Sequence, residues 1–226
     1  MAKLLLLETA TEVCSVGLAY NGQLVALHNA TTPNDHSRLL TTLIGEGMAT
    51  VGWSFSQLDA VAISQGPGSY TSLRVGAATA KGLCYSLGKP LIAVDTLAAL
   101  AEAGRLQEDA EDILYMPMID ARRDEVYTAV YDAALNALAP PHALALSAQA
   151  LAQWAGERHC LVTSGNGGHK ASVFLPRQVR FRAEIQCSAA HLIKPAEKAF
   201  CMNDFSNMAY FEPLYLKPPY VTQPKK

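Results

Sequence analysis

Apolar runs alternate with short polar breaks through the first thirty residues, and this pattern predicts three strands. The runs cover residues 3–9, 13–20 and 23–31, and Asn21-Gly22 separates the second from the third. An Asn-Gly pair between apolar runs is typical of a tight hairpin, because both central residues of a type I′ turn need a positive φ. The chain therefore opens with an antiparallel meander.

The spacing of apolar residues then changes to that of a helix. Leu39, Leu40, Leu43, Ile44 and Met48 recur at helical intervals over residues 35–50, which predicts a helix capped by Asn34 or Asp35.

A short apolar strand follows at 58–64, and a second helical stretch runs over 69–87. Gly88 and then Pro90 end that helix. A buried strand at 90–94 and a short helix from Thr96 complete this part of the chain.

The second half shows a weaker version of the same alternation. An acidic stretch at 101–112 separates it from the first half, and residues 113–119 and 125–131 predict a hairpin around the charged turn 120–124. A helix at 147–155, a strand at 160–163 and an alternating segment at 179–185 follow. Ser188 can cap a last helix, which Pro195 must kink or split because proline lacks a backbone N–H.

The order of elements favours an α/β fold with two lobes. Three strands, a helix, a strand, a helix and a strand are typical of the ribonuclease H-like lobe of the actin-like ATPase (ASKHA) superfamily. We therefore assign residues 1–100 to a first lobe and 101–226 to a smaller second α/β lobe, with the acidic stretch as the crossing.

Charge and hydropathy limit the possible partners. The formal net charge is −2, and the basic residues are dispersed apart from Lys225 and Lys226 at the end of the chain. Proteins that hold nucleic acid by themselves present a positive stripe, so we expect RNA to be bound only with a partner's help. The apolar run Leu4–Leu7 ends at Glu8, too short for an export signal, and we expect a cytoplasmic protein without membrane contact.

Residue types that carry catalysis or metals are not grouped in this sequence. The five cysteines form no C-x-x-C pair, and the six histidines show no ligand spacing. The G-x-S-x-G nucleophile motif is missing as well. We expect no catalytic residue, no cofactor and no metal site. The loop at 164–168 is glycine-rich, and a plain turn there is favoured over a nucleotide site.

The sharpest feature is the glycine-rich loop between the strand at 58–64 and the helix at 69–87. Such a loop can gather backbone N–H groups around a phosphate, but this one fits neither the Walker A nor the G-x-G-x-x-G pattern. A tight structural turn is favoured over a phosphate site. The loop residues singled out are Gly66, Pro67, Gly68, Ser69, Thr71 and Arg74.

Small residues line one face of the helix that follows this loop. They allow another backbone to approach closely, either within the same lobe or from another subunit. The second alternative predicts a partner-binding surface shared by the two helices of the first lobe. It consists of Leu39, Leu43 and Gly47 together with Gly76, Ala80 and Leu83.

Several segments spread over nearly the whole chain resemble the TsaB (YeaZ) family. The loop GPGSYTSLRVG is the most specific, and LETATEVCSVGL, DHSRLL, DARRDEVY and PLYLKP support it. Three departures from the family pattern are Glu8 in place of Asp, Ser72 in place of Gly, and Pro195. The resemblance implies an actin-like fold whose C-terminal segment returns to the first lobe. Glu8 argues against ATPase activity, because a longer side chain misplaces the carboxylate that organises metal and phosphates.

The resemblance also implies a function without catalysis. TsaB is the non-catalytic relative of TsaD (Kae1), whose metal-binding H-x-x-x-H pair is missing here, since Leu40 stands four residues after His36. The chain is expected to bind and activate TsaD for threonylcarbamoyl transfer to adenosine 37 of tRNA, with TsaE joining that complex and TsaC supplying the adenylate. It can form a homodimer when alone. An actin-fold small-molecule kinase or ATPase is the alternative, and a metallopeptidase is a weaker one.

Overall fold

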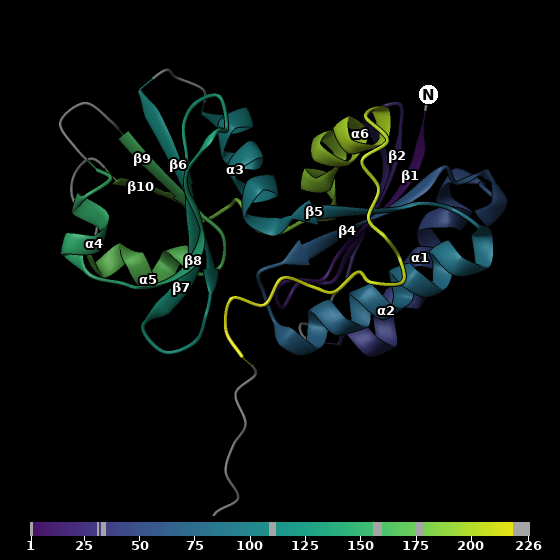
Figure 1. The fold of residues 1–226 in the computed structure, drawn as a ribbon, viewed down its shortest axis with the longest axis horizontal. Helices are drawn as coiled ribbons and strands as arrows, with labels where there is room; N and C mark the ends of the chain where they lie inside the picture. The colour runs from purple at the N-terminus through teal and green to yellow at the C-terminus, as the bar shows by residue number, and fades with distance from the viewer. Residues whose placement is uncertain are drawn as a thin grey trace, which may run out of the picture.

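The computed structural model describes residues 2–30, 32, 35–108, 112–155, 160–174 and 179–218. Two α/β lobes lie side by side, and each is built on a five-stranded sheet (Figure 1). This arrangement confirms the predicted two-lobed actin-like fold. The candidate capping residue Asn34 and the terminal pair Lys225 and Lys226 lie outside the described residues.

The first lobe contains the predicted meander. Its sheet has the order β3-β2-β1-β4-β5, with β1 antiparallel to β2 and parallel to β4. Asn21 and Gly22 have φ values of 53° and 73°, which confirms the turn predicted between β2 and β3. The strands are β1 (Lys3–Glu8), β2 (Ser15–Tyr20), β3 (Gln23–Asn29), β4 (Ala60–Gly66) and β5 (Leu91–Asp95).

Helices cover both faces of this first sheet (Figure 1). Successive side chains of β1 point to opposite faces, so Leu5 and Leu7 pack in one hydrophobic cluster and Leu4 and Leu6 in another. α1 (His36–Val51) and α2 (Tyr70–Leu87) cover the first cluster, while η3 (Ala189–Leu192) and α6 (Ile193–Cys201) cover the second. A short helix, η1 (Phe55–Gln57), precedes β4.

Both predicted helices of the first lobe are present, and their ends follow the expected chemistry in part. Gly88 ends α2 in the left-handed conformation, as predicted, with φ of 63°. Asp35 occupies the N-cap position of α1, but its side chain forms no capping hydrogen bond. Its carboxylate pairs instead with Arg38, at 2.6 Å.

The second lobe is reached through α3 (Thr96–Gln107), which packs on one face of its sheet. That sheet has the order β10-β9-β6-β7-β8, and α4 and α5 contribute to the cluster on its other face. The predicted hairpin is confirmed as β6 and β7. The remaining elements are β6 (Ile113–Asp120), β7 (Glu125–Tyr131), β8 (Ala137–Ala145), α4 (Ala148–Ala152), β9 (Cys160–Ser164), α5 (Gly168–Ala171), η2 (Ser172–Phe174) and β10 (Val179–Arg182).

Among the strands and α-helices of the described residues, two were not predicted. β8 contains Pro140 and Pro141, residues that argue against a strand, yet it lies at the edge of its sheet, where a missing N–H is tolerated. α5 begins directly at the end of the glycine-rich loop. Pro195 does not split the last helix as expected, because it stands in the first turn of α6, where its missing N–H costs nothing; the only change of helix type is from η3 to α6, between residues 192 and 193.

The segment after α6 runs back over the first lobe and on to the second, as the yellow end of the ribbon in Figure 1 shows. Ser206 bridges to Leu91 on the open edge of β5. The Leu214 amide donates to the Gln65 carbonyl, at 2.7 Å. Lys217 pairs with Glu125 at the start of β7. Among the described residues, no helix is long and apolar enough to cross a membrane.

Candidate partner-binding surface

The glycine-rich loop is held by two other segments of the same chain. A Cβ atom on Gly66, whose φ is 109°, would come within 2.8 Å of the Leu214 carbonyl oxygen. A Cβ atom on Gly68 would overlap the Ala10 carbonyl oxygen. Both glycines are therefore required by the close approach of neighbouring backbone.

Hydrogen bonds also hold the loop against Ala10 and against Thr96 at the start of α3. The Ser69 amide donates to the Ala10 carbonyl, at 2.7 Å, and the Gly66 amide donates to the Thr96 hydroxyl, at 3.1 Å. Pro67 is buried and joined to Gly66 by a cis peptide bond. Because the Gly66 and Ser69 amides are already used within the chain, the geometry favours the structural turn over a phosphate site.

The remaining loop residues lead outward onto α2. Thr71 and Arg74 are exposed. The Arg74 guanidinium lies 5.2 Å from the centre of the Tyr70 ring and donates to the Tyr70 hydroxyl, at 3.0 Å. The Tyr70 and Tyr215 rings are 4.7 Å apart, so the C-terminal segment completes this small aromatic cluster.

Glu8 is turned into the protein at the end of β1. Its Oε1 accepts hydrogen bonds from the Ala10 amide, at 2.7 Å, and from the Ser64 hydroxyl, at 2.9 Å. Burial raises the pKa of Glu8 to about 7, although these hydrogen bonds act in the opposite direction. The carboxyl group thus braces the loop after β1 and is not presented to a metal-bound phosphate.

The six residues predicted for the partner surface differ in burial, and four of them are inside the folded chain. Ala80 is 0% exposed in the folded chain, and Gly76 lies so close to Thr9 that a Cβ atom would overlap its hydroxyl. Leu43 and Gly47 are buried too, with Gly47 against Leu18. Leu39 and Leu83 are only partly buried.

This placement corrects the assignment for four of the six residues. The small residues of α2 face β1 and β4 of their own lobe, so their close approach is to the sheet and not to another subunit. An Ala80→Arg variant would disrupt the core before it could report on binding. On these two helices, only the opposite sides are open to a partner.

Those outer sides carry small residues that no contact among the described residues requires. A Cβ atom on Gly45 of α1 or on Gly82 of α2 would meet no atom within 4 Å. Each glycine costs a helix about 1 kcal/mol relative to alanine. Ala78 and Tyr85 lie on the exposed side of α2, and Tyr85 is 80% exposed. We define Gly45, Ala78, Gly82 and Tyr85 as the outer helix face.

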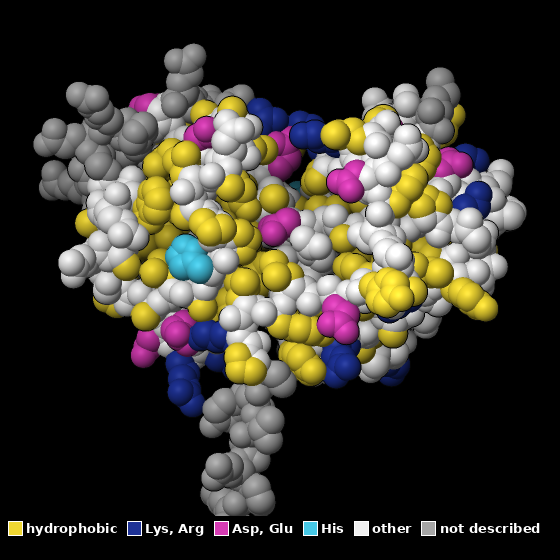
Figure 2. Space-filling view, in the orientation of Figure 1, with side chains coloured by type: hydrophobic (Ala, Val, Ile, Leu, Met, Phe, Trp, Pro, Cys, Tyr) yellow, Lys and Arg dark blue, Asp and Glu magenta, His cyan; other side chains and the backbone are white. Residues whose placement is uncertain are grey.

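A groove of about 610 Å³ continues the outer helix face toward the C-terminal segment. Tyr70, Arg74 and Ala78 line one side of it, and Tyr215 lines the other. Lys81 spans the two sides by donating to the Ala209 and Phe211 carbonyls. In Figure 2, charged side chains are scattered among hydrophobic ones over the visible face and form no basic stripe.

The glycine-rich loop of the second lobe contacts the first lobe through a side-chain hydrogen bond. The sequence analysis did not predict this contact. The Asn166 amide group donates to Glu12 Oε2, at 2.6 Å, and its Oδ1 accepts from the Asp120 amide, at 3.0 Å. Gly168 packs where a Cβ atom would overlap the Phe181 ring. The described residues contain no group of three or more His, Cys, Asp or Glu side chains able to hold a metal.

These features define a two-lobed protein of the actin-like ATPase fold class, whose two glycine-rich loops serve its own packing. The activator of the 2-hydroxyisocaproyl-CoA dehydratase from Clostridium difficile shares this fold, with a TM-score of 0.53 over 89% of this chain and 96% of that one, at 10% identity. A much closer likeness is to YeaZ from Pseudomonas aeruginosa, with a TM-score of 0.81 and 27% identity over 96% of this chain and all of that one.

Sequence comparison gives the family. The model of the TsaD family, described as tRNA N6-adenosine threonylcarbamoyltransferase, matches residues 30–209. The TsaB proteins of Haemophilus influenzae and Escherichia coli are 40% and 36% identical to this chain, over 55% and 57% of its length. The chain belongs to the TsaB (YeaZ) family, within the wider TsaD family. These alignments span about half of the curated relatives, 51% and 54% of their lengths.

Proposed function

We propose that this chain is a non-catalytic subunit that binds and activates a TsaD-type transferase in the synthesis of N6-threonylcarbamoyladenosine at position 37 of tRNA. The observation that carries the proposal is its likeness to relatives named as tRNA threonylcarbamoyladenosine biosynthesis protein TsaB. By the same likeness, TsaE joins through the complex, TsaC supplies the adenylate, and the protein acts in the cytoplasm.

The geometry around Glu8 supports a role without phosphoryl chemistry. A kinase of this fold class needs an ionised carboxylate that is free to organise a metal ion. Here the carboxyl is buried, bonded to Ala10 and Ser64, and has its pKa raised to about 7. The alternative function as a small-molecule kinase therefore gains no support at this position.

The proposed binding surface is the outer helix face. Gly45 and Gly82 have open space where a side chain would stand, so a partner helix could approach the α1 and α2 backbones closely. α1 and α2 also pack against each other, so the two glycines belong to one continuous surface. The same face could join a second copy of this chain when TsaD is absent.

Reconstitution tests the proposal directly. TsaC, TsaD, TsaE, threonine, bicarbonate, ATP and tRNA should form the modified nucleoside continuously only when this chain is added, as measured by nucleoside mass spectrometry. The chain alone should modify no tRNA. Sustained modification without this chain, or modification by this chain and TsaC alone, would overturn the activator role.

A matched pair of arginine substitutions tests the surface. Ala78→Arg places a long charged side chain on the exposed side of α2, and Ala148→Arg does the same on α4 of the second lobe. Both variants should fold, because both positions are exposed. Only Ala78→Arg should weaken TsaD binding in calorimetry, by a factor of ten or more, since an unpaired charge would be buried. Equal affinities for TsaD would contradict the assigned face.

A further inference from the structure

The two sheets end in four edge strands, and three of these edges are protected. Ser206 runs along the open edge of β5, where its amide donates to the Leu91 carbonyl, at 2.8 Å. β8 contains a pair of prolines, which lack the N–H that an added strand would need. β10 is only four residues long and carries two arginines. Cover, proline and charge are means by which natural edge strands avoid pairing with another chain.

β3 is the fourth edge strand, and its residues provide neither proline nor charge. Its seven residues include no proline and no Asp, Glu, Lys or Arg. Instead, Leu24, Val25 and Leu27 are 41%, 42% and 38% exposed. The register shift between β2 and β3 lies near the turn, so the stretch from Ala26 to Asn29 is regular. An uncharged, apolar strand at an open edge is the kind that pairs with another strand.

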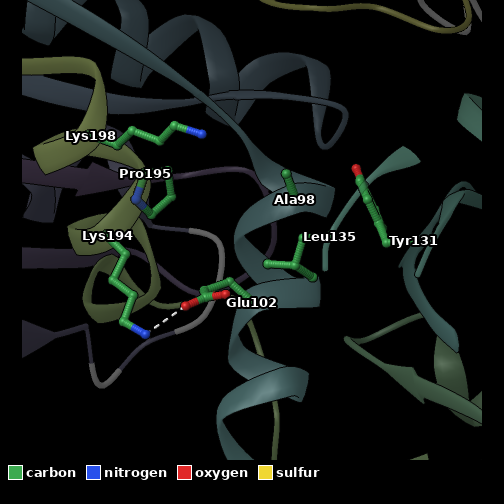
Figure 3. A pocket seen from close by; sticks show the side chains of 7 residues that line it. All are labelled: Ala98, Glu102, Tyr131, Leu135, Lys194, Pro195 and Lys198. Atoms are coloured by element: carbon green, nitrogen blue, oxygen red, sulfur yellow. Dashed lines mark ion pairs between the residues drawn. The ribbon is translucent and has the colours of Figure 1, made fainter. Parts of the chain in front are cut away.

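The helices on one face of the first sheet leave β3 partly uncovered. Leu27 lies opposite Gly17 of β2, and Gly17 faces Ala189 of η3. α6 packs against β5, at the far side of the sheet, where its Lys194 pairs with Glu102 of α3, at 2.8 Å (Figure 3). Among the described residues, the hydrophobic cluster under η3 and α6 includes none from β3. The apolar side chains of β3 on this face therefore remain open to solvent.

The backbone of β3 also presents hydrogen-bonding groups at this edge. The Ala30 amide donates to the Cys14 carbonyl, at 2.8 Å, so the backbone of Ala30 faces β2. In an antiparallel pair, residues bonded to the neighbouring strand alternate with residues whose N–H and C=O point away from it. Counted back from Ala30 along the regular register, the backbone groups of Leu27 and Asn29 point to the open edge.

We propose that β3 is an interface between two copies of this chain, which join their first sheets edge to edge. The two β3 strands run antiparallel about a two-fold axis at Leu27, where each Leu27 amide donates to the Leu27 carbonyl of the other copy. The two Leu27 side chains then lie side by side on the uncovered face. A two-fold axis brings the same surface of both copies together, and two uncharged edges meet without the repulsion that like charges would cause.

This contact is separate from the outer helix face. Ala78 belongs to α2, which packs on β4 and β1, whereas β3 is separated from β1 by β2. An interface built on one strand edge buries little surface, so the dimer should be weak and should form only as the concentration rises. The proposal does not depend on any role in tRNA modification, so either can fail while the other stands.

Sedimentation velocity of the full chain over a range of concentrations provides the test. The parent chain should shift from monomer to dimer as its concentration rises. Leu27→Lys should weaken the dimer by about tenfold or more, because two ammonium groups would lie side by side at the axis. Leu138→Lys is the matched control. Leu138 is 50% exposed on the edge strand β8, and this variant should form the dimer like the parent chain.

A mixture of two variants tests the position of the axis. Leu27→Glu should fail to dimerise alone, again because like charges meet. An equimolar mixture of Leu27→Lys and Leu27→Glu should form a heterodimer, because opposite charges then face each other across the axis. Recovery of the dimer in the mixture separates repulsion from misfolding, and thermal melting verifies the fold of each variant.

Several results would each overturn the proposal. A parent chain that stays monomeric at every concentration would leave the β3 edge to another protein. An unchanged dimer in Leu27→Lys, or no heterodimer in the mixture, would exclude a two-fold contact at Leu27. Loss of the dimer in Ala78→Arg would place the contact between copies on the outer helix face instead.

Discussion

The side chain of Asn166 joins the two lobes by donating to Glu12, with 2.6 Å between Nδ2 and Oε2. Its own lobe holds it in place, because its Oδ1 accepts from the Asp120 amide. Glu12 belongs to the turn between β1 and β2, two residues after Ala10, which contacts the glycine-rich loop of the first lobe. A single amide side chain thus links a loop of the second lobe to the turn after β1 of the first.

A double-mutant cycle on this pair should show coupling. Asn166→Ala and Glu12→Ala combined should destabilise the chain by about 1 to 2 kcal/mol less than the sum of the single changes, because each removes the same charge-assisted bond. Urea denaturation measures the free energies of unfolding. Asn166→Ala with Glu46→Ala on distant α1 should be additive. Full additivity for the first pair as well would mean that the bond contributes nothing.

The buried carboxyl of Glu8 predicts a pH dependence of stability. Its pKa rises from 4.5 to about 7 on folding, so the folded chain binds the proton more tightly than the unfolded chain. Ionisation of the buried Glu8 carboxyl therefore lowers the free energy of unfolding. This loss of stability is absent below about pH 4.5, grows as pH rises toward the folded pKa, and reaches about 3 kcal/mol above it.

Glu8→Gln should remove this dependence, because the amide has the shape of the protonated acid. The variant should be more stable than the parent chain at pH 8 and nearly equal to it at pH 5, in denaturant titrations at four pH values. Parallel pH profiles for the two chains would show that folding does not raise the pKa of Glu8.

Two glycines of α2 should respond in opposite directions to alanine. Gly76→Ala places a Cβ atom against Thr9 and should destabilise the chain by about 1 to 3 kcal/mol. Gly82→Ala meets open space and should stabilise the chain by up to about 1 kcal/mol while weakening TsaD binding. Thermal melting and calorimetry measure the two effects. A Gly82→Ala chain that binds TsaD unchanged would show that the partner does not approach α2 at this position.

The contact between Tyr70 and Tyr215 should anchor the C-terminal segment. Tyr215→Ala removes a ring 4.7 Å from that of Tyr70 and should destabilise the chain by about 1 kcal/mol. Tyr215→Phe keeps the ring and should cost less than half as much. If both substitutions have the same effect, the hydroxyl and not the ring contact is responsible.

The sequence predicted the elements that depend on local chemistry. Asn21-Gly22 required a turn, and Gly88 ended a helix, because positive φ is a property of those residues themselves. β8 escaped prediction because its prolines are tolerated only at an edge, and which strand lies at an edge depends on the whole sheet.

The candidate site was harder to predict for a related reason. Small residues at Gly76 and Ala80 correctly indicated a close neighbour, but the pattern does not say whether that neighbour is a partner or the sheet of the same lobe. The bridge from Asn166 to Glu12 joins residues 154 positions apart, a separation that leaves no periodic trace in the sequence.

The hydrogen bond from Leu214 to Gln65 also sets an order of events during synthesis on the ribosome. Gln65, just before the glycine-rich loop of the first lobe, is translated first, and the backbone that closes over it emerges 149 residues later (214 − 65). At about 5 to 20 residues per second, the loop stays uncovered for roughly 7 to 30 seconds. The first sheet can pair in that interval, whereas the surface beside α2 is completed only after Leu214 has emerged. A nascent chain should therefore form the strands of the first sheet before it acquires the groove beside α2.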